Sequence, residues 1–450
     1  MTLASRLKTP VNGFKGVSPL MKLPHFDLVW GYTVEYMHSV LLGVTRQFSD
    51  YWFDSSNSNE AYYMGRPSTL RLINQRLLSI RPPHHFTRLP RTLRERCYWK
   101  AHEWRNWLLF YCLPCCRPVL PQRYFRHFAL LSEAVFVLIL QELSSDQIDH
   151  AVAVRKSFKR LISSVDYVIL HGIGSSCLSH VYYSFSGLLL TTFVSQAAGL
   201  YGQRCMSFNV HQLLHLAEAA RQFGPLWAHS AFAFESSNGE LVKLVNAAKA
   251  VPEQVLERVI LSQELQILLS ALPLPSNVLN FCTNMLGNPR TEHARRIGAA
   301  WVFGAPKDVS SVSHQESSCL QAWCGHVPIV QEYLRFSFLG TIFHSQSYKA
   351  GRKNSSVFEC KSGGFYSIKR IFEITDSSSV LNGEAVLLCT KIITGDNIAG
   401  LPPHISDCFF SLAYSLVPLS INDIAKACVL ISLNDKEDYI CTVPNMLERD

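Results

Sequence analysis

The sequence predicts a mainly α-helical protein that ends in a small β-rich domain. Of its 450 residues, 48% are hydrophobic and 17% are charged, which is a globular composition. Apolar residues recur with helical spacing over most of the chain up to about Ala271, and from Tyr333 onward the period changes to two. Since a period of 3.6 marks helices and a period of two marks strands, the two parts of the chain differ in class.

The chain divides into five expected parts. The breaks follow changes in period and the segments that are rich in Pro, Gly and Ser. We expect an N-terminal segment with a basic block at 1–110, a helical subdomain at 111–204, further helices at 205–286, a linker at 287–328 and a small β-rich domain at 329–450.

A polar pair stands inside the first strongly apolar stretch. From Leu28 to Phe53 the apolar residues have helical spacing, and one face is formed by Val34, Met37, Leu41, Val44 and Phe48. Glu35 and His38 are three residues apart, so they lie together on a neighbouring face. This geometry permits a joint chemical role, although an ordinary surface pair has the same spacing.

Positive charge is concentrated in one block. The net charge is +8, yet the window from Arg66 to Arg126 alone holds thirteen Lys or Arg against Glu95 and Glu103, about +11. Clustered cations favour a polyanion such as nucleic acid, because phosphate neutralisation releases counterions. A solvated Arg-rich face is the alternative. Arginines interleaved with tryptophans single out one set as candidate DNA ligands: Arg88, Arg91, Arg94, Arg96, Lys100 and Arg105.

Cysteine usage and hydropathy bear on the compartment. The fourteen cysteines are scattered, which favours a reducing, intracellular compartment. The segment from Val181 to Gln203 is long enough to span a bilayer, but it holds three Ser, two Thr and two Gln. We therefore expect a pair of buried helices here and no membrane segment. A further apolar-faced helix is expected at 151–170.

Metal-binding patterns are weak. His211 and His215 have ligand spacing, but Gln212 stands where a zinc protease needs its glutamate. The cysteines near "LPCC", with His102 upstream, lack a second spaced pair. Carboxylates in apolar settings, Asp27, Glu35 and Glu235, offer the hard oxygens that Mg²⁺ prefers, although helix caps and ion pairs explain most such residues.

The C-terminal part has a clear strand pattern. Period-two runs extend over Ser356–Cys360, Phe365–Thr375 and Ala385–Ile393. Gly363 and Gly364 lie between the first two runs and predict a hairpin turn.

Four ordered blocks carry a resemblance to a known family. They read "KGVSPLMKLPHFDLVWGYTVEYMHSVLLGVTRQFSDYW", "RLPRTLRERCYWKAHEWRNWLLFYCLP", "NVHQLLHLAEAARQFGPLWAHSAFAFESSNGELVKL" and "FHSQSYKAGRKNSSVFE". In this order they resemble CACTA-type (En/Spm-like) DNA transposases, over most of residues 14–375. The resemblance implies an RNase H-like nuclease core with a helical insertion, Mg²⁺-dependent strand cleavage and transfer, DNA as partner, and a nuclear location.

The resemblance also assigns roles to residues. Glu35 and His38 match the family's acidic-x-x-His element, in which the acid is usually aspartate, so they become candidate catalytic residues. Glu235 matches the acidic residue after the insertion, so it becomes the candidate third catalytic carboxylate and metal ligand. Family members carry the first strands and the first catalytic aspartates ahead of this region, so residues 1–110 are expected to be a partial nuclease segment.

Three interpretations therefore stand open. The first is a transposase-derived protein, a truncated C-terminal portion that binds DNA but lacks a complete catalytic set. The second is an active nuclease subunit that a partner chain completes, either another copy or a full-length transposase. The third is a helical interaction protein whose basic block is incidental, and DNA affinity that does not fall steeply with salt would favour it.

Overall fold

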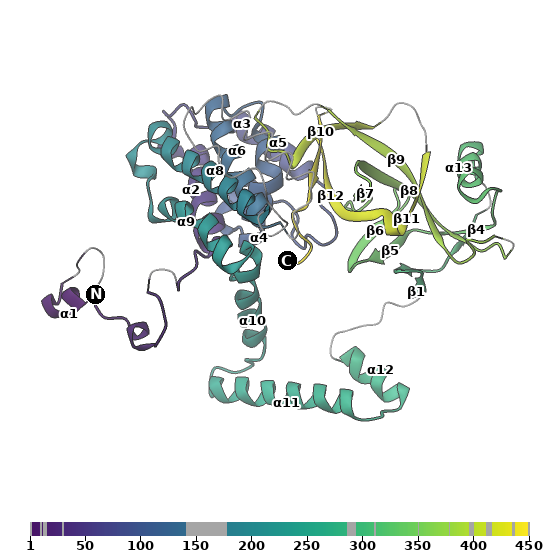
Figure 1. Cartoon of the computed structure of the whole chain (residues 1–450), viewed down its shortest axis with the longest axis horizontal. Coiled ribbons are helices and arrows are strands. Elements are labelled where there is room, and N and C mark those ends of the chain that lie inside the picture. The colour runs from purple at the N-terminus through teal and green to yellow at the C-terminus, as the bar shows by residue number, and fades with distance from the viewer. Residues whose placement is uncertain are drawn as a thin grey trace.

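The fold consists of a helical body, a helical arm and a β-rich part (Figure 1). The arm is made of α10 (Phe232–Lys243), α11 (Val251–Ala271) and α12 (Ser276–Met285). It was obtained as a computed structural model, which describes residues 2–9, 11, 16–28, 31–140, 178–285, 294–309, 312–349, 351–377, 379–395, 400–410, 416–433 and 437–448. The predicted mainly α class with β structure towards the C-terminus is confirmed.

The helical body is built from short and medium helices. After the short α1 (Thr2–Leu7), its helices are α2 (Arg46–Phe53), α3 (Pro67–Ser79), α4 (Ala101–Asn106), α5 (Cys112–Cys116), α6 (Gln122–Leu138), α8 (Leu178–Tyr201) and α9 (Phe208–Phe223). Two wider π-helical segments, η2 (Met37–Thr45) and η5 (Trp107–Tyr111), run directly into α2 and α5. The 3₁₀ turns are η1 (Pro19–Lys22), η3 (Ser55–Asn57), η4 (Leu93–Tyr98), η7 (Gln203–Cys205), η8 (Leu226–His229) and η9 (Ile421–Asp423).

The helix expected at Leu28–Phe53 forms over its second part, as η2 and α2. Its predicted inner face is buried at Met37, Leu41, Val44 and Phe48. Gly43 lets α9 approach closely, because a Cβ there would lie 2.5 Å from the Asn209 side chain. The apolar period thus predicted the correct face, and a glycine permits the contact.

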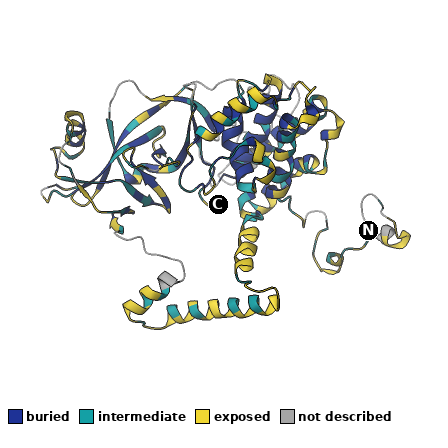
Figure 2. Cartoon of the chain, turned by 180° about the vertical axis from the view of Figure 1, so that it is seen from behind, coloured by how far each residue is buried: buried dark blue, intermediate teal, exposed yellow. Residues whose placement is uncertain are grey.

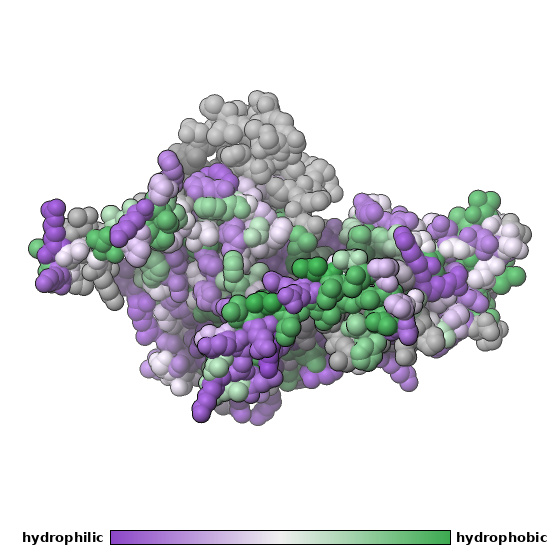
Figure 3. Space-filling model, turned by 90° about the horizontal axis from the view of Figure 1, so that it is seen from below, coloured by the Kyte–Doolittle hydropathy of each residue, from purple (hydrophilic) through white to green (hydrophobic). Residues whose placement is uncertain are grey.

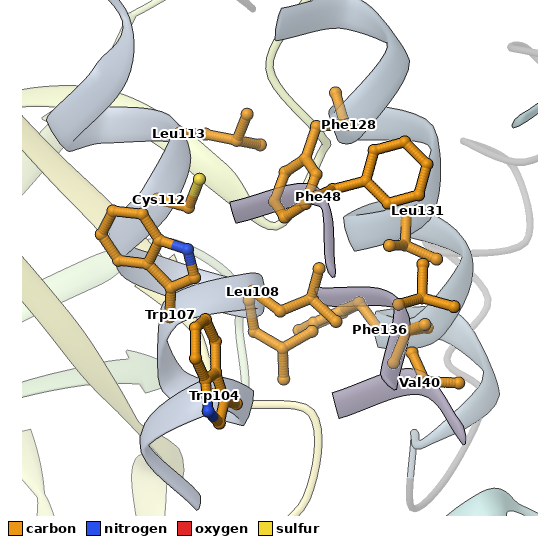
Figure 4. Close-up of a cluster of buried hydrophobic side chains, with 14 of the residues drawn as sticks. Val40, Phe48, Trp104, Trp107, Leu108, Cys112, Leu113, Phe128, Leu131 and Phe136 are labelled. Carbon is orange, nitrogen blue, oxygen red and sulfur yellow. The ribbon is translucent and has the colours of Figure 1, made fainter. Parts of the chain in front are cut away.

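Tryptophans fill the core of the body (Figure 4). Trp99, Trp104 and Trp107 are only 7%, 1% and 0% exposed. The Trp107 indole donates to Ser49 Oγ at 3.0 Å, and the Trp52 indole donates to the Tyr201 hydroxyl at 3.2 Å. These buried rings stabilise the body and are not available to stack on bases.

The long apolar stretch beginning at Val181 lies within α8. This helix packs between α6 and α9, and Leu190 and Phe193 are fully buried. Across the parts of the chain that the structure describes, no helix has the length and hydropathy required to cross a membrane. The second predicted helix, at 151–170, lies outside the described residues.

The expected linker at 287–328 contains regular structure instead. It holds β1 (Ala294–Ile297), β2 (Ala300–Phe303), β3 (Lys307–Asp308) and α13 (His314–Cys324). Strands of four residues are too short to show a clear period, and Arg295–Arg296 makes the first one look polar. The helix did have a local signal: Ser313 and Glu316 form a capping box, and Gly325 ends it with a φ of 81°.

The remaining strands form two sheets. They are β4 (Val330–Tyr333), β5 (Arg335–Phe338), β6 (Thr341–His344), β7 (Val357–Cys360), β8 (Phe365–Ile374), β9 (Ala385–Thr394), β10 (Ile405–Phe410), β11 (Leu416–Ser420), β12 (Ile424–Ser432) and β13 (Asp438–Thr442). The smaller sheet has the order β1-β2-β5-β6. In the larger one, antiparallel pairing runs β8-β7-β12-β13-β10-β9 and returns to β8, which closes a six-stranded barrel.

The three strands predicted in this region are confirmed as β7, β8 and β9. The turn between the first two also agrees, because Gly363 and Gly364 have φ values of 86° and 83°, a region that favours glycine. Barrel closure leaves no open edge along these strands.

Body and barrel share one hydrophobic core. Ile405, Val429, Ile431 and Tyr439 of the barrel belong to the same buried cluster as the tryptophans of the body. Some strands of the β-rich part therefore extend the core of the body, while Phe358, Ile368 and Leu387 belong to a second cluster inside the β-rich part.

Two buried histidines make the fold sensitive to acid. His127 Nε2 donates to the Phe193 carbonyl at 2.9 Å, and His404 Nε2 donates to the Leu109 carbonyl at 3.0 Å. Burial lowers the pKa of His127 from 6.5 to about 4 and that of His404 to about 3. Below pH 6.5 the unfolded chain takes up protons that the folded chain does not, so stability falls as the pH falls.

We expect each histidine to lower the free energy of unfolding by about 2 kcal/mol between pH 8 and pH 5. Urea unfolding at the two pH values measures this loss. The double variant His127→Gln, His404→Gln keeps both donors, so it should lose clearly less stability over the same interval. A pH dependence equal to that of the wild type would contradict the assignment.

Candidate functional site

Glu35 caps the helix that it precedes. Its Oε1 accepts a hydrogen bond from the amide of Met37 at 2.9 Å, and its Oε2 accepts from the amide of His38 at 2.8 Å. The same Oε2 lies 2.7 Å from His38 Nδ1. A carboxylate at this position satisfies free amides and interacts favourably with the helix dipole. The predicted proximity of Glu35 and His38 is thus present, with a local structural role.

The same carboxylate reaches a helix from a distant part of the sequence. Glu35 Oε1 also accepts from the amide of Ala231 at 2.9 Å, and Ala231 is the N-cap residue of α10 (Phe232–Lys243). Glu235 lies in the first turn of this helix, and its amide donates to the Ala231 carbonyl at 2.9 Å. The structure therefore brings Glu35, His38 and the start of the Glu235 helix to one corner. Glu235 itself is exposed there.

Aromatic contacts fix the base of α10. Phe232 stacks on His102 with ring centroids 4.0 Å apart and meets Tyr36 edge-on at 6.1 Å. His229 Nδ1 lies 3.1 Å from Thr33 Oγ1, and burial lowers the pKa of His229. Sequence reasoning missed these contacts, because nothing local links residues that are more than a hundred positions apart.

The corner suits capping better than metal binding. Glu35 already accepts four hydrogen bonds, about the full capacity of a carboxylate. Among the described residues, no group of three or more His, Cys, Asp or Glu side chains is placed to hold a metal ion. Glu235 as a ligand for Mg²⁺ remains a prediction from the resemblance.

The other candidate metal ligands are an exposed pair of histidines and a set of buried cysteines. His211 and His215 have their Nε2 atoms 3.3 Å apart on an exposed face of α9. Cys112 and Cys115 are fully buried, and burial raises the pKa of both thiols. A thiol held in its protonated form is a poor metal ligand.

Three of the six candidate DNA-binding residues form ion pairs, and the first two of these are Arg91 and Arg96. Arg91 donates to both oxygens of Glu103, at 2.6 and 2.7 Å, and Glu103 is only 8% exposed. Arg96 Nε lies 2.8 Å from Asp50 Oδ1. Both arginines therefore have a structural role that the basic pattern alone did not suggest.

Arg105 holds the C-terminal segment in the body. It lies 3.4 Å from Glu448, and both side chains are 6% exposed. The Tyr36 hydroxyl also donates to Glu448. Burial and the nearby carboxylate raise the pKa of Tyr36 well above its usual value. The pair is too buried to meet a phosphate backbone. Arg88, Arg94 and Lys100, by contrast, are exposed.

A basic surface forms where a loop of the body meets a turn of the β-rich part. The amide of Asn354 donates to the Pro82 carbonyl at 2.9 Å, and the amide of His84 donates to Ser355 Oγ at 2.8 Å. Lys353 donates to the Phe86 carbonyl. These bonds join segments that lie about 270 residues apart in the chain.

Four exposed cations flank this junction, and we call them the basic ridge: Arg81, Arg88, Lys349 and Arg352. Neither 80–92 nor 343–355 contains an acidic residue. The pKa of His84, at the junction, is lowered first by burial and then by His344, Lys353 and Arg335. Basic side chains of the β-rich part therefore lie close enough to act on the loop.

Comparisons with known protein families, with curated proteins and with solved structures find no match.

The capping role of Glu35 predicts a specific pattern of stability. Glu35→Ala should lower the free energy of unfolding by about 1–2 kcal/mol, because several amides at two helix starts lose their acceptor. Glu35→Gln retains one acceptor oxygen and should cost less. Urea unfolding provides the measurement, and Glu235→Gln is the exposed control. Equal stabilities of Glu35→Ala and the wild type would show that the cap is unimportant.

The buried pair gives a second prediction. Arg105→Ala should cost about 3–5 kcal/mol, because the buried Glu448 carboxylate would lose its only cationic partner among the described residues. Arg94→Ala removes the same charge from an exposed position and should change stability by less than about 0.5 kcal/mol. Thermal or urea unfolding of the two variants tests the contrast. Similar losses would mean that Arg105 is not part of the core.

Proposed function

We propose that this chain is a transposase-derived, nuclear DNA-binding protein of the CACTA type. In this proposal, the basic ridge binds the phosphate backbone of DNA. The observation that carries the proposal is the junction of the loop 80–92 with the turn 343–355. Arg88 opens the second block that resembles the transposases, and Lys349 and Arg352 lie in the fourth block. Two blocks that are far apart in the chain thus contribute cations to one surface.

The chemistry of the ridge supports this role. Arg81, Arg88 and Arg352 carry guanidinium groups, which bind phosphate oxygens in a bidentate manner. The absence of carboxylates from both segments leaves these charges without a competing partner close in sequence. Exposed cations in such a cluster release counterions from DNA when they neutralise phosphates, and this release drives binding.

We also propose that the chain binds DNA without cutting it. The four hydrogen bonds accepted by Glu35 support a structural role for the acid of the acidic-x-x-His element. In the alternative proposal, the nuclease subunit, Glu235 binds Mg²⁺ together with ligands from a partner chain. The helical interaction protein is the third proposal, in which the ridge has no polyanion partner.

The experiment is DNA binding by the purified chain over a series of salt concentrations. The double variant Arg88→Ala, Arg352→Ala should weaken binding and make the slope of log K against log salt less negative by about 1.8, since each phosphate contact contributes about 0.9. The matched control is Arg221→Ala, Arg296→Ala, which removes the same charge at exposed positions outside both segments.

The same samples, with Mg²⁺ or Mn²⁺ added, distinguish the proposals. Salt-sensitive binding without cleavage supports the proposed function. Cleavage that Glu235→Gln abolishes would favour the nuclease subunit. DNA affinity that does not change with salt concentration would rule out the basic ridge as the DNA-binding surface. Equal losses of affinity in the two double variants would rule it out as well.

A further inference from the structure

The small sheet exposes one of its two faces. Its strands pair in the order β1-β2-β5-β6, and the register places Trp301 opposite Ser337 and Ser337 opposite Ile342. The next residues along two of these strands, Val302 and Phe336, are buried. Figure 2 shows this change between buried and more exposed residues along strands of the β-rich part. One face of the small sheet therefore packs into a core, and the other, which we call the outer face, is open to solvent.

The outer face combines aromatic rings with arginines. Its residues are Arg296, Trp301, Phe303, Arg335, Ser337 and Ile342. Trp301 is 49% exposed and Ile342 is 36% exposed. The four strands of the small sheet contain no Asp or Glu. Seen from the side of the arm, hydrophilic and hydrophobic side chains are mixed over the β-rich part, whereas hydrophobic ones gather along the arm (Figure 3). The strands of the outer face thus supply aromatic surface and only positive charge.

Arg335 links the outer face to the basic ridge. Its Cζ atom lies 5.8 Å from the centre of the Phe303 ring and 5.0 Å from the centre of the Tyr348 ring. Tyr348 directly precedes Lys349 of the basic ridge. At the other end of the sheet, Arg296 Nε donates to a backbone carbonyl at 3.1 Å, a bond that does not neutralise its charge. Positive charge therefore continues from the basic ridge across the small sheet.

We propose that the outer face binds single-stranded DNA, with an unpaired base stacked on Trp301 and with phosphates bound by Arg296 and Arg335. This inference rests on the DNA-binding function proposed above and extends the DNA-binding surface from the basic ridge onto the sheet. Four strands spaced by roughly 4.8 Å give the sheet a width of about 14 Å. Four-stranded sheets with exposed aromatic rings stack about two or three unpaired bases, so the size fits.

The chemistry of the outer face selects a single strand over other partners. A face with only positive charge favours an anionic ligand, and duplex DNA meets that requirement as well. In a duplex, however, both sides of each base are covered by neighbouring bases, so an indole ring cannot stack on them. Single strands offer both phosphates and free base faces, and they bind to basic surfaces that carry aromatic rings. Trp301 beside the arginines is this combination.

The test is binding of an oligothymidylate of about twelve nucleotides to the full chain, beside a duplex of the same length. Trp301→Ala should weaken binding of the single strand about tenfold and leave the affinity for the duplex unchanged. Trp301→Phe keeps a ring and should recover part of the loss. The matched control is Trp323→Ala, which removes an indole that is 37% exposed on α13 and should change neither affinity. Both tryptophans are exposed, so the variants should fold.

A series of salt concentrations separates stacking from charge. Because tryptophan is uncharged, Trp301→Ala should leave the slope of log K against log salt unchanged. Arg296→Ala should make this slope less negative by about 0.7 for the single strand, the contribution of one phosphate contact. A changed slope in Trp301→Ala would contradict stacking as the role of this ring.

These measurements distinguish failure of the inference from failure of the proposed function. If Arg88→Ala, Arg352→Ala weakens DNA binding and Trp301→Ala does not, the outer face is overturned and the basic ridge stands. If neither DNA binds, both proposals fail and the outer face is left to a protein partner. Equal losses in Trp301→Ala and Trp323→Ala would also overturn the outer face. Tighter binding of an oligouridylate of the same length would overturn DNA as its ligand.

Discussion

The hydrophobic core shared by the helical body and the barrel is the constraint on which the rest of the structure depends. Strands β10, β12 and β13 bury Ile405, Val429 and Tyr439 against the helices that begin the chain. Hydrophobic burial is the main favourable term in folding, so separation of the two parts would expose the apolar residues on both sides of this contact. This packing also sets where the loops of each part meet.

The packing around the shared core determines which arginines are buried in ion pairs and which are exposed. Glu448, close to the end of the described chain, lies between Tyr36 and Arg105 because β13 leads the chain back into the body. Arg105 must be neutralised there, since a buried charge without a partner is costly. Arg88 lies on the loop that meets the turn of the β-rich part, where the backbone takes the hydrogen bonds and the guanidinium stays exposed. Arginine thus forms a buried ion pair at position 105 and carries an exposed charge at position 88.

The corner at Glu35 links the body to the arm. By accepting from Ala231 as well as from the start of η2, this carboxylate sets the position of α10, from which α11 extends. The stacking of Phe232 on His102 fixes the same helix from another side. The position of the arm relative to the body therefore depends on a few polar and aromatic contacts at its base.

By itself, the sequence determined the features that depend on neighbouring residues. The buried face of η2 and α2, the strands β7, β8 and β9 and the glycine turn between the first two all follow from period and turn chemistry. The closeness of Glu35 and His38 was predicted from a shared helix face, whereas Glu35 in fact precedes the helix and reaches His38 as a cap.

Only the tertiary structure decided which residue meets which across the chain. It assigned Ala231 to Glu35, Glu448 to Arg105 and the turn at 343–355 to the loop at 80–92. It also turned the apparent linker into strands, because four-residue strands are stabilised by the sheet they join and not by their own sequence. The reason is physical: a pattern of neighbours fixes local conformation, while the partner of a charge or a strand depends on how distant segments pack.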